Sequence, residues 1–510
     1  EKSIILSEES LSQYPELDTK KANLIELKQQ LNEKLNDYPR LAATQRVEYT
    51  TFSKIGEKLS DDHTVIIQWY LLEADQKFCA FIYTLQRSQP YVWESSLEDF
   101  ENLQEWHKEY FLSYGQFIWI LKNYQVFDSF EELKQTMISA LTSIEESPEE
   151  ILPTQKQRDF ILNYVTNLKK PDQWIDELSD RLNRLAKILH IDDLLNHLPK
   201  TCQQVILIPH RYLHLLPIHA LPIKTETWQK FNPNSTPNQD NYLFECFTKG
   251  VRYAPSCQTL LMLEKRSRPN FNQLFAMGNP TQDRAFTELC VKTVETFWKQ
   301  KHQQSKPKVL CGQQATKNAL INELKDYLKN AHTFLYSGHG SFEFESPLDS
   351  GLILHDKPLQ LTEIFGLNLE QCRLVTLIGC ETGMTDRTSI TDEYIGLPSA
   401  FLWAGVSGIV SSLWTVQEKA SVFLGIKLYQ ILLDQTEGEK NVIQALREAQ
   451  SWLRNVTKSH LSELSDWMYD HDLLPPQLDD ELRQFLAPRK DDDKPFSSPY
   501  YWAAFCVIGK

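Results

Sequence analysis

Short apolar segments alternate with amphipathic helical patterns from His332 to the C-terminus. The apolar segments have the length of buried strands, and the longer segments between them repeat their apolar residues with the period of a helix. Strands that alternate with helices are typical of a mostly parallel sheet covered by helices on both faces. The sequence therefore predicts an α/β fold with three layers, α/β/α.

The expected elements divide the chain into three regions. We expect a helical segment over residues 1–60, a region with a β-hairpin and helices over 61–270, and the regular α/β region over 271–510. The expected strands lie at 64–92 (a hairpin), 205–209, 250–253, 273–280, 332–337, 352–354, 374–378, 408–414 and 500–509. The expected helices lie between 97 and 197 and near 286–298, 316–328, 361–365, 398–404, 420–433 and 442–453, and 224–241 is expected to be an exposed loop.

Composition excludes several classes of protein. The formal net charge of −15 over 510 residues argues against general binding to nucleic acid. No run of about 18 apolar residues is present, so no membrane span is expected. Nine cysteines without a Cys-x-x-Cys pair, and no export signal, favour the reducing cytoplasm. Because the chain begins with Glu1, we expect that an upstream segment or a tag has been removed, or that a protease has processed it.

Two apolar segments end in a reactive residue. Leu335-Tyr336-Ser337-Gly338 leads to His339, and Leu377-Ile378-Gly379 leads to Cys380. Ligand sites of parallel sheets lie at the carboxyl ends of the strands, which is where both residues are expected. A thiol is a strong nucleophile only as the thiolate, and a neighbouring imidazole can take its proton. The pair predicts a Cys-His hydrolase.

Glycines surround both residues and permit a close approach of substrate. The backbone N–H groups of Gly340 and Cys380 are candidates for an oxyanion hole. The sequence indicates no third carboxylate to orient His339, and a backbone carbonyl could do the same. No zinc spacing is present, so we expect no metal and no cofactor, and the histidines at 210, 214 and 219 are expected to pack in turns. The remaining cysteines are expected to be buried apolar residues.

Further motifs carry a resemblance to a known family. In order along the chain they are Ile208-Pro209-His210, Leu215-Leu216-Pro217-Ile218-His219-Ala220-Leu221, Tyr253-Ala254-Pro255-Ser256, Gly278-Asn279-Pro280, Ser337-Gly338-His339-Gly340, Gly379-Cys380-Glu381-Thr382-Gly383, Ser412-Leu413-Trp414-Thr415-Val416 and Tyr501-Trp502-Ala503-Ala504-Phe505. Together they resemble the CHAT domain, a caspase-like domain related to separase. The resemblance runs from about residue 150 to the C-terminus, and we expect it to begin at the hairpin at residue 64.

The resemblance implies a caspase-like fold in which an inactive caspase-like half (61–270) precedes the active half (271–510). It implies a cysteine endopeptidase with His339 and Cys380 as the dyad and a protein as substrate. CHAT domains are often fused to tetratricopeptide repeats, but no 34-residue period occurs here. By analogy it also implies antiviral defence in bacteria, with a partner protein or ribonucleoprotein complex as activator.

The chain departs from the family pattern at two places. Tyr336 is bulkier than the usual alanine, and position 378 lacks the acid with which related proteases bind a basic side chain. Glu381, Asp386 and Asp349, together with Asp392, are candidate substitutes for that acid, although an ordinary solvated surface position is the favoured interpretation of each, and an apolar preference stays open. The polar segment 384–394 follows the nucleophile, and we expect it to gate the protease.

Two alternatives to a peptidase stay open. The first is a catalytically inactive CHAT scaffold that transmits a signal. The second is acyl transfer or deamidation by the same two residues. The leading prediction is a cytoplasmic CHAT-family cysteine protease.

Overall fold

The structure is a computed structural model of the 510-residue chain. It describes residues 63–87, 89–123, 171–237, 240–266, 271–343, 346–379, 394–436 and 441–510, together with Ile55, 134–135, Arg268 and Thr382. Residues 52–510 form one compact unit. The helical segment predicted over 1–60 lies almost wholly outside the described residues, so it stays a prediction.

The region before residue 271 supplies five strands to a large sheet, with helices and a small hairpin around them. The predicted hairpin is confirmed, because the first two strands of the chain are antiparallel neighbours. The elements are β1 (Thr64–Leu72), β2 (Lys77–Tyr83), β3 (Tyr91–Glu94), α5 (Leu97–Asn123), α8 (Pro171–Ile188), α9 (Ile191–Asn196), β4 (Gln204–Ile208), β5 (Pro222–Ile223), α10 (Thr225–Phe231), β6 (Asn241–Tyr242), β7 (Gly250–Tyr253) and α11 (Cys257–Glu264).

The region from residue 271 onward supplies six strands to the same sheet. The elements are β8 (Leu274–Gly278), α12 (Ala285–Lys301), β9 (Lys308–Cys311), α13 (Lys325–Lys329), β10 (Thr333–Ser337), β11 (Gly340–Ser341), β12 (Gly351–Leu352), β13 (Leu359–Gln360), α14 (Leu361–Phe365), β14 (Leu374–Ile378), α15 (Leu397–Trp403), β15 (Gly408–Ser412), α16 (Glu418–Asp434), α17 (Val442–Asn455), α18 (Lys458–Asp470), α19 (Pro476–Leu486), α20 (Pro499–Trp502) and β16 (Phe505–Gly509).

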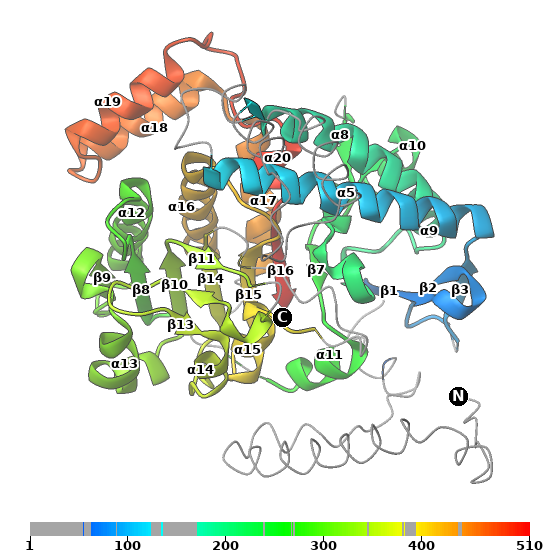
Figure 1. The fold of residues 1–510 in the computed structure, drawn as a ribbon, viewed down its shortest axis with the longest axis horizontal. Helices are drawn as coiled ribbons and strands as arrows, with labels where there is room; N and C mark the ends of the chain where they lie inside the picture. Colours follow the sequence, from blue (N-terminus) through cyan, green and yellow to red (C-terminus); the bar gives the residue numbers. More distant parts are fainter. Residues whose placement is uncertain are drawn as a thin grey trace, which may run out of the picture. The chain divides into compact units, whose positions relative to one another are not determined.

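The eleven strands form one sheet in the order β3-β2-β1-β4-β7-β16-β15-β14-β10-β8-β9 (Figure 1). The strands β15, β14, β10, β8 and β9 are mutually parallel, and so are β1, β4, β7 and β16. The two parallel sets run in opposite directions, because β16 pairs with β15 antiparallel. The carboxyl ends of the strands in one set therefore lie beside the amino ends of the strands in the other set.

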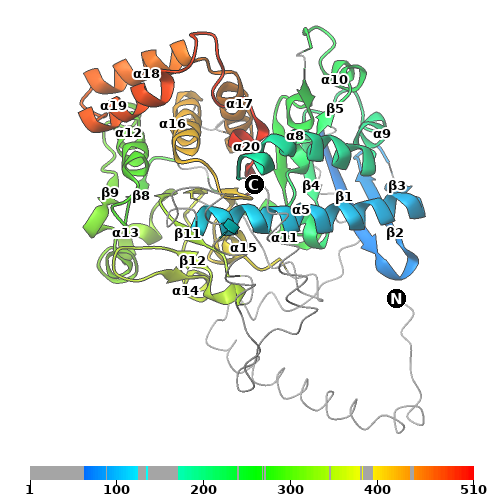
Figure 2. The ribbon, with the colours of Figure 1, turned by 45° about the horizontal axis from the view of Figure 1, so that its top comes forward.

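Helices cover both faces of the sheet, which confirms the predicted α/β/α fold (Figure 2). On one face, the ring of Phe334 in β10 lies 6.1 Å from that of Phe401 in α15. On the other face, the Tyr429 hydroxyl of α16 hydrogen-bonds Thr376 of β14 at 2.9 Å. Successive residues of a strand point to opposite faces, so nearly every residue of β10 and β14 is enclosed.

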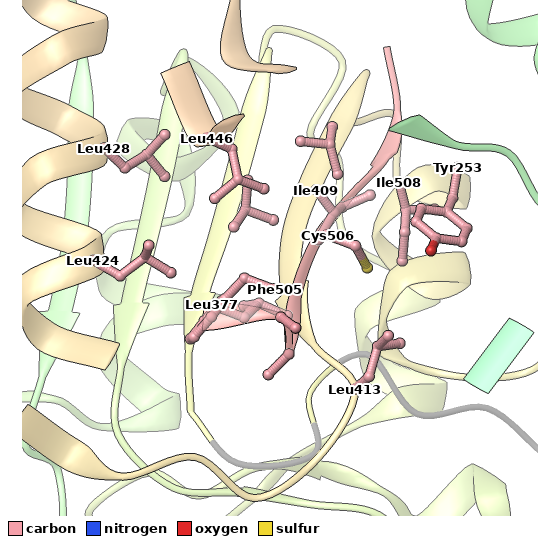
Figure 3. Close-up of a cluster of buried hydrophobic side chains, with 14 of the residues drawn as sticks. Tyr253, Leu377, Ile409, Leu413, Leu424, Leu428, Leu446, Phe505, Cys506 and Ile508 are labelled. Carbon is pink, nitrogen blue, oxygen red and sulfur yellow. The ribbon is translucent and has the colours of Figure 1, made fainter. Parts of the chain in front are cut away.

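The core continues across the junction of the two parallel sets (Figure 3). There Ile409 of β15 and Phe505 of β16 are fully buried, and Leu424 of α16 and Leu446 of α17 are buried in the same cluster. A strand buried on both faces reads as a continuous apolar run, which is why the sequence revealed β10, β14 and β15.

Three predicted elements need correction. The segment 224–241 is not simply an exposed loop, since it begins with α10, and Asn241 pairs with Ile223 in the small hairpin of β5 and β6. The predicted strand 500–509 begins instead as α20, because Pro499 and the Ser498 side-chain cap favour a helical turn. The predicted helix 316–328 is divided into a π-helical turn at 319–323 and α13. The hairpin of α18 and α19 was not predicted.

Candidate active site

The strands β10 and β14 are parallel neighbours whose last residues are in register, Ser337 opposite Ile378. The Gly338 N–H donates to the Ile378 carbonyl at 3.1 Å. A Cβ atom on Gly379 would lie only 2.4 Å from the Gly338 carbonyl oxygen. The two backbones thus touch immediately before His339 and Cys380 in the sequence. Cys380 itself lies outside the described residues, as do Glu381, Asp386 and Asp392.

The side chain of Tyr336 contacts the backbone of His339. The fully buried Tyr336 hydroxyl lies 2.7 Å from the His339 carbonyl oxygen and 2.8 Å from that of Ile353. Burial raises the pKa of this hydroxyl well above its usual value, so the group keeps its proton and acts as a donor. The Ile353 N–H also donates to the His339 carbonyl, at 2.9 Å. The bulk of Tyr336, a departure from the family pattern, therefore supports the histidine loop.

The imidazole of His339 faces a carboxylate. Its Nε2 lies 3.0 Å and 3.2 Å from the two carboxyl oxygens of Asp283, with the His339 side chain 28% exposed. Partial burial works to raise the pKa of Asp283, but hydrogen bonds from Thr281 and His339 outweigh it and hold the pKa below its usual value. An ionised Asp283 can accept the Nε2 proton and orient the ring.

Arg284 shares this corner of the site. Its Nε lies 3.4 Å from Nε2 of His339, and its guanidinium lies 3.7 Å from the Glu418 carboxylate at the start of α16. Burial raises the pKa of Glu418 against the opposing charge of Arg284. If Nε2 donates to Asp283, it cannot also accept from Arg284, and the lone pair of the ring then lies on Nδ1. This tautomer has a base ready on the nitrogen that faces away from Asp283.

Sequence reasoning found no carboxylate to orient His339, and it missed Asp283, which the structure places beside the ring. The residue lies five positions after the end of β8, which is the neighbour of β10 in the sheet. Its loop is shaped by Asn279, whose side chain accepts from the Arg284 N–H at 2.9 Å. The rule that chemistry gathers at the carboxyl ends of strands applies to β8 as well, and applying it there could have found this residue.

The other described candidates differ in what surrounds them. Asp349 is exposed and accepts from the Ser346 hydroxyl at 2.6 Å, so it closes a short turn. Gly340 pairs with Leu352 in a small antiparallel sheet beside His339. Hydrogen-bonded and non-hydrogen-bonded pairs alternate in such a sheet, and the neighbouring Ile353 N–H bonds His339. The alternation directs the Gly340 N–H away from β12.

Other nucleophiles and metal sites are disfavoured among the described residues. Burial raises the pKa of Cys257, Cys290, Cys311, Cys372 and Cys506 to about 12, so these thiols stay protonated. His210 and His219 are buried and hydrogen-bonded, as expected of packing histidines. Within the described ranges, no group of three or more His, Cys, Asp or Glu side chains could hold a metal ion.

Comparison with known families decides the classification. Residues 179–510 match the CHAT domain. The chain belongs to the CHAT family. No curated protein matches it.

Two solved structures are similar to the chain over long stretches. The Saccharomyces cerevisiae separase–securin complex contains a chain that matches 82% of this one at 15% identity, with a TM-score of 0.43. The Arg-specific cysteine proteinase gingipain R (RgpB) matches 63% of this chain at 10% identity, with a TM-score of 0.37. The CHAT chain spans 30% of the matched separase-complex chain and 66% of the gingipain chain.

No helix among the described residues is both long and apolar enough to cross a membrane.

Proposed function

We propose that this CHAT protein is a cysteine endopeptidase in which Cys380 is the nucleophile and His339 the general base. Asp283 orients His339, and the backbone N–H groups of Gly340 and Cys380 stabilise the oxyanion. The observation that carries the proposal is the pairing of His339 with Asp283 beside the contact between Gly338 and Gly379. It brings a base to the strand end that leads directly into the only cysteine expected to react.

The proposed reaction uses each group in turn. His339 takes the thiol proton on Nδ1, and the Cys380 sulfur attacks the peptide carbonyl carbon. The carbonyl oxygen becomes an oxyanion, which accepts from the two N–H groups. When the C–N bond breaks, the imidazolium gives its proton to the leaving amine. Water, deprotonated by His339, then hydrolyses the thioester.

Asp283 contributes by stabilising the imidazolium that forms in each step. Its carboxylate keeps the proton on Nε2, so that the other nitrogen is the one that exchanges protons with the thiol and the amine. The lowered pKa of Asp283 means that the carboxylate stays ionised in mildly acidic solution. A third group that orients the histidine is common in serine and cysteine hydrolases, and Asp283 supplies it in this proposal.

The substrate protein, gating through 384–394, activation by a partner protein or ribonucleoprotein, antiviral defence and the cytoplasmic location stay predictions from the sequence. So do the inactive caspase-like half at 61–270 and the pocket acids. Asp349 is the one candidate acid whose surroundings are described, and its bond to Ser346 favours a role in the turn.

Thiol reactivity tests the proposal without knowledge of the substrate. We expect iodoacetamide to alkylate Cys380 faster than Cys311, the most exposed of the described cysteines, as measured by peptide mass spectrometry over time. Incubation of the wild-type chain with a peptide library should give cleavage that Cys380→Ala abolishes and Cys311→Ala retains. Equal reactivity of the two thiols and no difference between the two variants would favour the inactive scaffold.

A further inference from the structure

A clasp of two hydroxyl groups joins the end of β14 to the end of β15. The Ser412 hydroxyl donates to the Gly379 carbonyl at 2.5 Å. The Ser412 N–H donates to the Thr382 hydroxyl oxygen at 3.2 Å. Both side chains are fully buried. The chain is therefore tied to β15 on both sides of positions 380 and 381.

The hydrogen bonds of the clasp form a closed set. The Ser412 hydroxyl proton is committed to Gly379, and the Thr382 oxygen already accepts from the Ser412 N–H. The Thr382 proton can then go to the Ser412 oxygen or to the carbonyl of Gly379 or Leu377, each 3.4 Å away. Buried polar groups normally have hydrogen-bond partners. Here the Ser412 hydroxyl bonds the Gly379 carbonyl, and the Thr382 hydroxyl bonds the Ser412 N–H. Removing the Ser412 hydroxyl takes the 2.5 Å donor from the Gly379 carbonyl, and removing the Thr382 hydroxyl takes the acceptor from the Ser412 N–H.

Gly379 is confined between the two neighbouring strands. Besides the Gly338 oxygen at 2.4 Å, an added Cβ would meet the Thr382 methyl group at 3.4 Å. The absence of a side chain lets this peptide approach Gly338, but it also leaves the peptide without a side chain to hold its orientation. The hydrogen bond from Ser412 supplies that restraint.

We propose that Ser412 and Thr382 are positioning residues that orient the peptide unit between Gly379 and the next residue. A peptide unit is planar and trans, so its C=O and N–H point in opposite directions. Since the Gly379 carbonyl accepts from Ser412 of β15, a planar trans unit would direct its N–H to the opposite side, toward β10. The clasp holds this N–H as an oxyanion donor. This inference rests on the proposed function, in which Cys380 carries that N–H.

The experiment compares two small reagents that differ in whether an oxyanion forms. p-Nitrophenyl acetate acylates a thiol through a tetrahedral oxyanion, whereas iodoacetamide alkylates it by direct displacement at carbon. We expect Ser412→Ala to lower the second-order rate of acylation at Cys380 by about tenfold to a hundredfold. The rate of alkylation at the same thiol should stay within about twofold, because the thiolate and His339 are unchanged.

Matched variants separate the effect of losing a hydrogen bond of the clasp from the effect of disturbing the packing around it. Thr382→Val removes a hydroxyl at constant size and should lower acylation selectively, whereas Thr382→Ser keeps the hydroxyl and should retain it. Ser411→Ala removes a fully buried hydroxyl from the neighbouring position of β15 and should leave both rates unchanged. Melting temperatures, measured for every variant, identify any that fail to fold.

The outcomes distinguish the two proposals. Selective loss of acylation in Ser412→Ala and Thr382→Val supports the clasp. Equal loss of both reactions, or no loss of either, in folded variants overturns it, even if Cys380 is the nucleophile. If wild-type Cys380 reacts no faster than Cys311 with either reagent, the proposed function fails.

Discussion

Two histidines lie at corresponding places in the two halves of the sheet. His339 is the second residue after the end of β10, and His210 is the second residue after the end of β4. His339 is flanked by glycines, partly exposed, and faces Asp283. His210 follows a proline, is 6% exposed, and has its ring centroid 4.2 Å from that of Tyr70, with the two rings tilted. The same position at a strand end therefore does not make the same chemistry.

The hydrogen bonds of the two rings explain the difference. Nδ1 of His210 accepts the backbone N–H of Leu71 at 3.0 Å, so this nitrogen already holds a bond that stabilises β1. His339 instead has Nε2 beside a carboxylate, and in the proposed mechanism its other nitrogen carries out the proton transfer. An imidazole whose basic nitrogen is used by the backbone is a structural group, even at the end of a strand.

The direction of the strands separates the two histidines further. Because β15 and β16 are antiparallel, β4 and β10 run in opposite directions, and their carboxyl ends point to opposite sides of the molecule. His210 cannot serve the site around His339. The region before residue 271 contributes packing, and the described acid–base pair at the proposed site comes from the region after it.

The largest expected effect is the loss of catalysis on changing His339. His339→Ala should lower peptide cleavage at least about a thousandfold, since it removes the general base. Peptides that the wild-type chain cleaves in the library serve as substrates, and kcat and KM are measured separately. Cleavage within tenfold of wild type in this variant would contradict the assigned role of His339.

The next effect tests the carboxylate partner. Asp283→Asn should lower kcat by about tenfold to a hundredfold with little change in KM, because the ring loses the group that stabilises its protonated form. Asp99→Asn is the matched control, since Asp99 also bonds a histidine, His190, at 3.0 Å but lies in the other half of the molecule. Equal kcat values for Asp283→Asn and wild type would show that Asp283 does not orient the base.

A smaller effect, on stability, is expected at His210. His210→Ala should lower the free energy of unfolding by about 1–3 kcal/mol, because the Leu71 N–H loses its acceptor. His210→Asn supplies an oxygen near the same place and should recover part of the loss. Urea unfolding measures both, and kcat should not change in either variant. A loss of kcat without a loss of stability would contradict the structural role that we assign to His210.

The smallest effect concerns pH. Burial lowers the pKa of His219 to about 3, against about 6.5 when the side chain is exposed. Between pH 6.5 and about 3 the unfolded chain binds a proton that the folded chain does not bind, so the free energy of unfolding falls as pH decreases, by at most about 1.4 kcal/mol per pH unit. His219→Gln should reduce this slope between pH 6 and pH 4, as measured by urea unfolding. An unchanged slope would mean that His219 is protonated in the folded protein.

The strands with the highest burial were the most predictable elements. β10 and β14 are covered on both faces, and their apolar runs end at a glycine, so both the strands and the residues after them could be read from the sequence. α10 was missed because its sequence, Thr225–Phe231, is polar and short, and its packing depends on Asp192, which accepts from Thr227 at 2.6 Å. Such long-range partners leave no periodic signal.

The sequence by itself determined the α/β class, the order of most strands along the chain, and His339 and Cys380 as candidates at two strand ends. Those properties follow from local patterns of apolar residues and from the glycines that end the apolar runs. Only the tertiary structure decided that β10 and β14 are neighbours in register, that Asp283 faces His339, and that Ser412 hydrogen-bonds Gly379 and Thr382. Each of these depends on which strands pair, and strand pairing joins residues that are far apart in the chain.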